Sequence, residues 1–87
     1  MVTEEQKLSV KKMLVEQLRL RMEPAEIEDD TPLFGEGLGL DSVDAIELVA
    51  AVEHAYGVVL ASEDEAKSVL TNVASLTEHI VAKGGLS

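Results

Sequence analysis

The sequence predicts an all-α protein: a small four-helix bundle of three longer helices and one short helix, with a long loop between helices 1 and 2. Apolar residues recur at helical spacing in several segments, and these segments begin at residues that cap helices. One short apolar run, residues 58–60, could pass for a strand, but the sequence offers it no partner strand. The 87 residues contain no cysteine, so helix packing must supply the core. We expect one domain, residues 1–87.

The first helix is predicted to begin after Thr3, because Thr3 and Gln6 have the spacing of a capping box. Its buried stripe consists of Val10, Met13, Leu14 and Leu18. Three lysines fall off this stripe: Lys7, Lys11 and Lys12. The pattern weakens after Arg21 and Pro24 blocks continuation, so the helix is predicted to end between Leu20 and Glu23.

Residues 24–41 are predicted to form a long loop, because prolines and glycines are frequent there. A loop of this length in a small domain is usually functional. Four apolar side chains are expected to pin it to the helices: Ile27, Leu33, Phe34 and Leu38. The acidic residues of the loop suggest calcium, but the Asp-x-Asp-x-Asp-Gly register of ligands is absent, so we predict no metal site.

The second helix is predicted to run from Ser42 to about Tyr56 and to stop at Gly57, a suitable residue just past a helix end. Asp41 is the expected N-cap, and Asp44 follows at the spacing of an acidic capping-box partner. The expected core face consists of Ala45, Leu48, Val49, Val52 and Tyr56.

A second apolar stripe on this helix starts beside Ser42. It consists of Val43, Ile46 and Ala50, and acidic residues flank it: Asp44, Glu47 and Glu53. The stripe could simply widen the core face, as is common in small bundles. Alternatively, it is partly exposed and contacts partner proteins between its acidic neighbours. We favour the second interpretation.

Two further helices complete the bundle. Residues 58–60 are expected to be an extended connection. Ser62 followed by an acidic first turn predicts a short third helix through about Val69. Asn72 is the expected cap of the last helix, which ends at Gly84-Gly85 and has one apolar face of Val73, Leu76 and Ile80.

Charge is distributed unevenly along the chain. The net charge is −10, and residues 22–66 hold 13 of the 17 acidic residues and none of the seven basic ones. A nucleic-acid-binding protein needs the opposite pattern, so we exclude that class. Such acidic runs are usually solvated faces, but these acids surround Ser42, which favours steering of basic protein partners.

With no bilayer-length apolar run and no signal peptide, we expect a cytoplasmic monomer that does not insert into membranes.

Ser42 is the first residue of the second helix, so its hydroxyl lies beside the positive end of the helix dipole. Most such serines are ordinary helix starts, but unpaired amides and the dipole together favour a phosphate, and the hydroxyl is well placed to carry a phosphodiester. A hydrolase is not indicated, because Gly-x-Ser-x-Gly is absent. The two histidines, His54 and His79, are expected at the surface or near helix ends and show no sign of a triad.

The run from Leu40 to Leu48 resembles the prosthetic-group site of acyl carrier proteins. Three residues match the Gly-x-Asp-Ser-Leu-like motif of that family: Gly39, Asp41 and Ser42. Val43 stands where leucine is more frequent, and the Glu47-Leu48 pair matches the Glu-Leu pair that usually follows. The resemblance extends from the first helix to the last, although the first loop is somewhat longer than in the common fatty-acid carriers.

The resemblance implies that Ser42, with Asp41 beside it, carries covalent 4′-phosphopantetheine from coenzyme A. The thiol of that group would hold acyl intermediates as thioesters for fatty-acid, lipid or polyketide-type synthesis. A thioester carrier without cysteine must import its thiol on a prosthetic group. The protein would be no enzyme but a cosubstrate of acyl-transfer enzymes. Its partners would be a phosphopantetheinyl transferase and acyl-transfer or synthase enzymes with basic surfaces. The expected partner surface consists of Val43, Asp44, Ile46, Glu47, Ala50, Glu53, Glu63 and Asp64.

Three alternatives stay open. The chain could be a peptidyl or D-alanyl-type carrier, or an unmodified acidic helical interaction module in which Ser42 is free or phosphorylated. A small enzyme is disfavoured by the missing cysteine and the sparse histidines. The aliphatic core around Leu48, Val49 and Val52 could part to admit a fatty chain, or it could be merely a small core.

Overall fold

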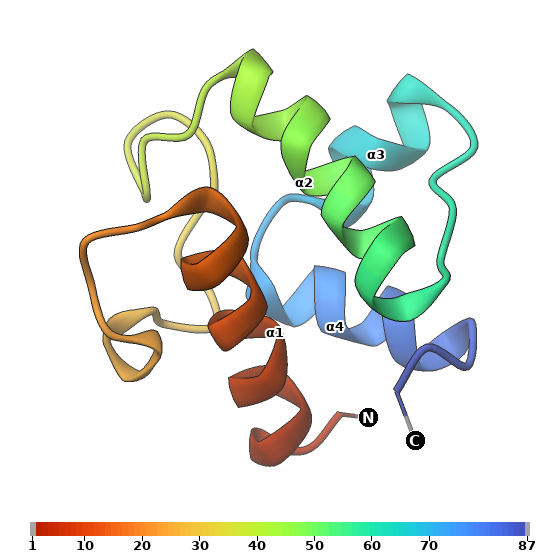
Figure 1. The fold of residues 1–87 in the computed structure, drawn as a ribbon, viewed down its shortest axis with the longest axis horizontal. Helices are drawn as coiled ribbons and strands as arrows, with labels where there is room; N and C mark the ends of the chain where they lie inside the picture. The colour runs from red at the N-terminus through yellow and green to blue at the C-terminus, as the bar shows by residue number, and fades with distance from the viewer. Residues whose placement is uncertain (1, 87) are drawn as a thin grey trace.

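The computed structural model of the protein describes residues 2–86 and contains four α-helices in that range. They are α1 (Glu4–Leu18), α2 (Ser42–Tyr56), α3 (Glu63–Val69) and α4 (Val73–Ala82), and a single 3₁₀ turn, η1 (Pro24–Glu26), lies in the first loop. Helix α1 packs against α2 and α4, and α3 packs against α4 (Figure 1). The predicted all-α bundle with one short helix is confirmed.

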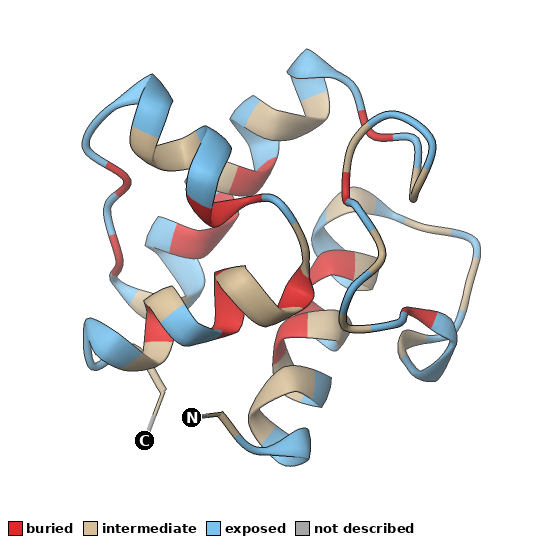
Figure 2. Ribbon diagram, turned by 180° about the vertical axis from the view of Figure 1, so that it is seen from behind, coloured by how far each residue is buried: buried red, intermediate tan, exposed pale blue. Residues whose placement is uncertain are grey.

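The core is aliphatic and draws on all four helices, with buried residues on the sides that face one another (Figure 2). The predicted stripe of α1 is buried at Val10, Met13 and Leu14, whereas Leu18 is only partly buried. On α2 the fully buried side chains are Leu48 and Val52, and three predicted core residues are half-buried: Ala45, Val49 and Tyr56. The face of α4 is buried as predicted.

Helix α1 ends at Leu18, so the predicted end between Leu20 and Glu23 is wrong. Arg19 has φ = 52° and lies in the left-handed region, which turns the chain out of the helix. The amides of Arg19 and Leu20 both donate to the carbonyl of Val15. Glycine usually occupies this position, so nothing in the sequence marked the turn.

Two lysines of α1 anchor the first loop through Asp29. Lys7 Nζ lies 2.6 Å from Asp29 Oδ2 and Lys11 Nζ lies 2.8 Å from Asp29 Oδ1. Both lysine side chains fall off the apolar stripe as predicted, yet they are only 13% and 12% exposed because the loop covers them. The hydrogen bonds from Lys11 and Lys7 hold the pKa of Asp29 below its usual range, and the hydrogen bond to Asp29 raises the pKa of Lys7.

The second half of the loop folds back on itself before α2. The amide of Leu38 donates to the carbonyl of Pro32, and that of Leu40 donates to Leu33. Leu33 in turn donates to the carbonyl of Thr71 between α3 and α4. A Cβ at Gly37 would lie 1.7 Å from the Pro32 oxygen, so this turn requires glycine there. The predicted apolar pins are buried at Ile27 and Leu33 and half-buried at Phe34 and Leu38.

The remaining elements follow the sequence closely. Residues 58–60 form a connection that is neither helical nor paired as a strand, Ser62 caps α3, and Asn72 caps α4. His54 is exposed in the last turn of α2, and His79 is half-buried in the last turn of α4, where its Nε2 lies 3.4 Å from Glu65 Oε1. The prediction of a surface or helix-end position therefore holds for both histidines. Within residues 2–86, no helix combines the length and the apolar character needed to cross a membrane.

Arg19→Gly should stabilise the protein by about 1 kcal/mol, because glycine adopts the left-handed conformation without the clash of a Cβ. Gly57→Ala is the matched control, since Gly57 ends α2 with φ = 69° and has open space around its Cα. It should destabilise the protein by a similar amount. Urea unfolding at pH 7 measures both changes, and a loss of stability in Arg19→Gly would contradict the assignment of strain.

Asp29→Asn should lower stability at pH 7 by about 1 kcal/mol, because a charged acceptor of two lysines is lost. The pKa of Asp29 is lowered in the folded protein from its ordinary value of 3.8, so its contribution is complete above that pH and is lost as the pH falls through the lowered pKa of the folded protein. The difference in stability between the two proteins should therefore narrow in urea unfolding as the pH falls below 3.8. Asp30→Asn, at an exposed neighbour, is the control, and a gap that is constant from pH 7 to pH 3 would refute the pairing.

Candidate functional site at the start of helix α2

Two aspartates close the N-terminus of α2 reciprocally. The amide of Asp44 donates to Asp41 Oδ1 and the amide of Asp41 donates to Asp44 Oδ2, each at 3.0 Å. This is the predicted capping box. Both carboxylates are therefore engaged by backbone amides, which suits a structural role better than a catalytic one.

Ser42 is left free by this arrangement. Because Asp41 is the cap, Ser42 is the first helical residue, and it is exposed. Within the described range, neither the Ser42 hydroxyl nor the amides of Ser42 and Val43 have a hydrogen-bond partner. An unengaged hydroxyl thus lies beside two open amides at the positive end of a 15-residue helix, a place that favours a phosphate group.

Ser62 provides a comparison within the same chain. It is also exposed and also stands at a helix start, but it is the N-cap of α3, and its hydroxyl accepts a hydrogen bond from the Glu65 amide at 3.1 Å. Its oxygen therefore stabilises the helix that follows. Of these two serines, only Ser42 has a hydroxyl that makes no helix-capping hydrogen bond.

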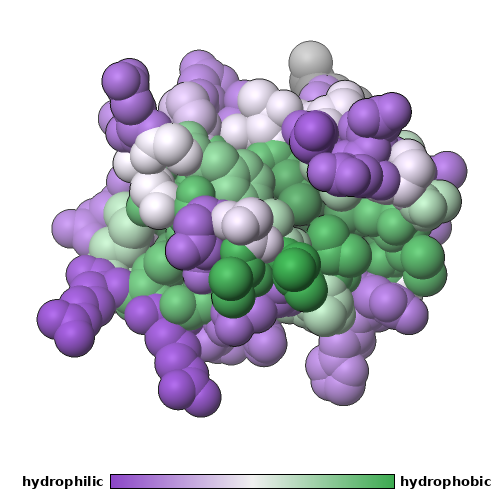
Figure 3. Space-filling view, turned by 90° about the horizontal axis from the view of Figure 1, so that it is seen from above, coloured by the Kyte–Doolittle hydropathy of each residue, from purple (hydrophilic) through white to green (hydrophobic). Residues whose placement is uncertain are grey.

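An apolar groove of about 950 Å³ opens beside Ser42, between α2 and α3. Ser42 and Ser62 lie on its rim, and Ala45, Ile46 and Val49 of α2 form one wall. The other walls come from the first loop, the connection before α3 and α3 itself: Pro32, Phe34, Leu60, Ala61, Glu63, Ala66, Lys67, Leu70 and Thr71. Figure 3 shows apolar side chains in a continuous band across this end of the molecule.

The second apolar stripe of α2 is a surface ridge. Val43 is 61% exposed and Ile46 is 71% exposed, and Ala50 is exposed as well. The structure thus decides between the two interpretations of this stripe: it does not widen the core. Glu47 and Glu53 flank the ridge and are exposed.

The other acidic residues of the predicted partner surface differ in accessibility. Asp44 is half-buried and belongs to the capping box. Glu63 and Asp64 lie exposed in the first turn of α3, across the apolar groove from α2, and Glu63 pairs with Lys67 at 3.7 Å. The apolar groove is therefore bordered by an acidic side chain, Glu63, on the α3 side.

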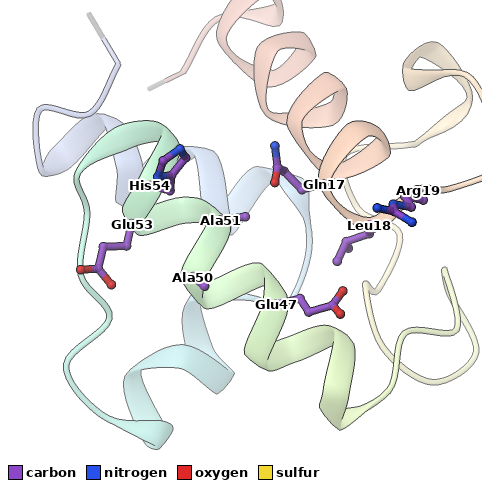
Figure 4. Close-up of a pocket in the computed structure, with 8 residues that line it drawn as sticks. All are labelled: Gln17, Leu18, Arg19, Glu47, Ala50, Ala51, Glu53 and His54. Carbon is purple, nitrogen blue, oxygen red and sulfur yellow. The ribbon is translucent and has the colours of Figure 1, made fainter.

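A second groove, of about 1020 Å³, lies on the other side of α2, against the end of α1 (Figure 4). Ala50 and Ala51 lie along α2, and polar side chains surround them: Gln17, Arg19, Glu47, Glu53 and His54. Sequence reasoning missed this groove, because it expected α1 to continue past Arg19. The small residues at 50 and 51 were the only signal.

No histidine is placed to activate Ser42. His54 follows Ser42 on the same helix by twelve residues, which corresponds to about 18 Å along the axis. His79 lies on α4 and contacts Glu65 of α3. The arrangement offers an accessible hydroxyl, an anion-favouring helix end and an apolar groove, with no general base of its own among these side chains.

Comparison with known protein families identifies this architecture. A family model described as the phosphopantetheine attachment site matches residues 9–80, which include α2, α3, most of α1 and both grooves. The family is that of the acyl carrier proteins, in which the domain is the attachment site for covalently bound 4′-phosphopantetheine. The match covers well over half of the chain, and the chain therefore belongs to the phosphopantetheine attachment site family.

Proposed function

We propose that the protein is an acyl carrier protein in which Ser42 carries 4′-phosphopantetheine. The observation that carries the proposal is the free Ser42 hydroxyl at the open end of α2, on the rim of an apolar groove. The protein would act as a cosubstrate: it presents a bound acyl group to the active sites of other enzymes.

The residues around Ser42 fit the group. A phosphodiester on Oγ would lie next to the open amides of Ser42 and Val43, which stabilise negative charge. When attached, the group supplies a thiol, which this cysteine-free chain lacks and which forms thioesters with acyl groups. The apolar groove begins at the same serine.

Attachment would need a base from the transferase. The Ser42 oxygen would form a new bond to the phosphorus of coenzyme A nearest the pantetheine, the pyrophosphate bond would break with adenosine 3′,5′-bisphosphate as the leaving group, and the hydroxyl proton would pass to the base. Asp41 and Asp44 are occupied by backbone amides, so they hold the serine at the helix start and are poorly placed to take that proton.

The lining of the groove favours an apolar cargo, which supports fatty-acid, lipid or polyketide-type synthesis over peptidyl or D-alanyl transfer. Leu48 and Val52 are fully buried against the bundle, whereas Val49 lines the groove. An apolar chain would therefore lie between α2 and α3, because the groove between α2 and α1 is lined mostly by polar side chains. Glu47, Glu53, Glu63 and Asp64 would attract enzymes with basic surfaces.

Incubation with coenzyme A and a broad-specificity phosphopantetheinyl transferase should add one 4′-phosphopantetheine mass to the wild-type chain. Ser42→Ala should abolish the gain completely, because the acceptor oxygen is gone, and Ser62→Ala, the matched control at the other helix start, should retain it. Intact-mass spectrometry reads all three proteins. A folded wild-type chain that gains no mass would sink the proposal and leave an unmodified interaction module.

Glu47→Lys should slow the transfer of 4′-phosphopantetheine to Ser42 about fivefold at low salt. The substitution replaces a charge that attracts a basic enzyme surface with one that repels it, on the exposed face of α2. Lysine forms helices as readily as glutamate, so stability should hardly change. Initial rates of modification at low and high salt provide the test, with Glu78→Lys on α4 as the charge-matched control. Equal rates for Glu47→Lys and wild type at low salt would refute the steering role.

A further inference from the structure

The groove between α1 and α2 contains two charges of opposite sign that are not paired with each other. Arg19 and Glu47 both line it. In Figure 4 the Glu47 carboxylate is directed toward the end of α1, where Leu18 and Arg19 lie, and the Glu53 carboxylate points away from them. Among residues 2–86, neither Arg19 nor Glu47 makes an ion pair within 4.0 Å. Both charges are therefore available to another molecule.

Arg19 is an unusual residue for its position, because its backbone has a positive φ. It is the only residue other than glycine with a positive φ among those described. Most L-residues are strained in this conformation, and glycine serves at the same place after α2. Strained positions persist chiefly where the surrounding structure or a function requires that side chain. Arg19 lines the groove between α1 and α2, so a function that requires its side chain would be carried out in that groove.

The groove is close enough to Ser42 for one enzyme to cover both. Glu47 follows Ser42 by five residues, which is about 7.5 Å along the axis of α2. A standard protein interface covers about 800 Å² of each partner, which is a patch roughly 30 Å across. An enzyme that acts on the Ser42 hydroxyl with such an interface would therefore rest on the ridge of α2 and reach the groove beyond it.

We propose that Arg19 is a specificity-determining contact for the transferase that modifies Ser42, and that it pairs with a carboxylate on that enzyme. The partner surface would then carry an acidic residue next to the basic residues that meet Glu47. A uniformly basic surface would be repelled by Arg19, so the pair Glu47 and Arg19 selects a partner with the matching alternation of charge. This inference rests on the proposed attachment at Ser42.

The direction in which the substitution Arg19→Asn changes the KM of the transferase tests the inference. Arg19→Asn keeps a residue that tolerates the left-handed conformation but removes the charge. With the phosphopantetheinyl transferase as the probe, KM for Arg19→Asn should rise about two- to fivefold at low salt, the effect of losing one exposed ion pair. The kcat should not change, because the reacting atoms are untouched. Arg19→Lys should restore most of the wild-type KM, and Lys12→Gln, an exposed charge elsewhere on α1, should have no effect.

The two contrary results are equally clear. A fall in KM for Arg19→Asn would mean that Arg19 only repels a basic enzyme, and an unchanged KM would mean that the enzyme does not contact the groove. Either one overturns the inference while leaving modification of the wild-type chain, and hence the proposed function, intact. Failure of the wild-type chain to be modified at all would instead remove the proposed function first.

Discussion

The exchange of hydrogen bonds between Asp41 and Asp44 is the interaction on which the site depends. Every helix needs acceptors for its first amides, and serine is among the residues that most often supply them. If Ser42 were the cap, its hydroxyl would be consumed, as that of Ser62 is at the start of α3. Because Asp41 is the cap, the serine moves one position into the helix and keeps its oxygen free.

The first loop holds this capping box in place. The beginning of the loop is linked to α1 by the ion pairs of two lysines with Asp29. The carbonyl of Asp29 also accepts a hydrogen bond from the amide of Ala74 in α4. The end of the loop is tied through Leu33 to the carbonyl of Thr71 between α3 and α4. The start of α2 is thus fixed relative to α3, and the two helices form the apolar groove next to Ser42. The contacts that anchor the first loop therefore also position the two helices that form the apolar groove.

Local chemistry explains how much could be predicted from the sequence. The bounds of α2, α3 and α4 follow from caps that are visible in the chain, and the exposure of Ser42 follows from Asp41. The end of α1 could not be predicted, because arginine rarely adopts a left-handed conformation. The burial of Lys7 and Lys11 depends on Asp29, which lies far away in the sequence. Both grooves arise from the packing of helices, so the sequence carries little signal for them beyond the small residues Ala50 and Ala51.

The central claim is that the Ser42 oxygen bears a phosphodiester. A phosphorus–proton correlation spectrum of the protein after treatment with coenzyme A and transferase measures this linkage directly. We expect one phosphodiester signal, correlated with the β-protons of Ser42 and with the methylene protons of the pantetheine arm. A signal correlated with another residue, or a folded protein without any phosphodiester signal, would contradict it.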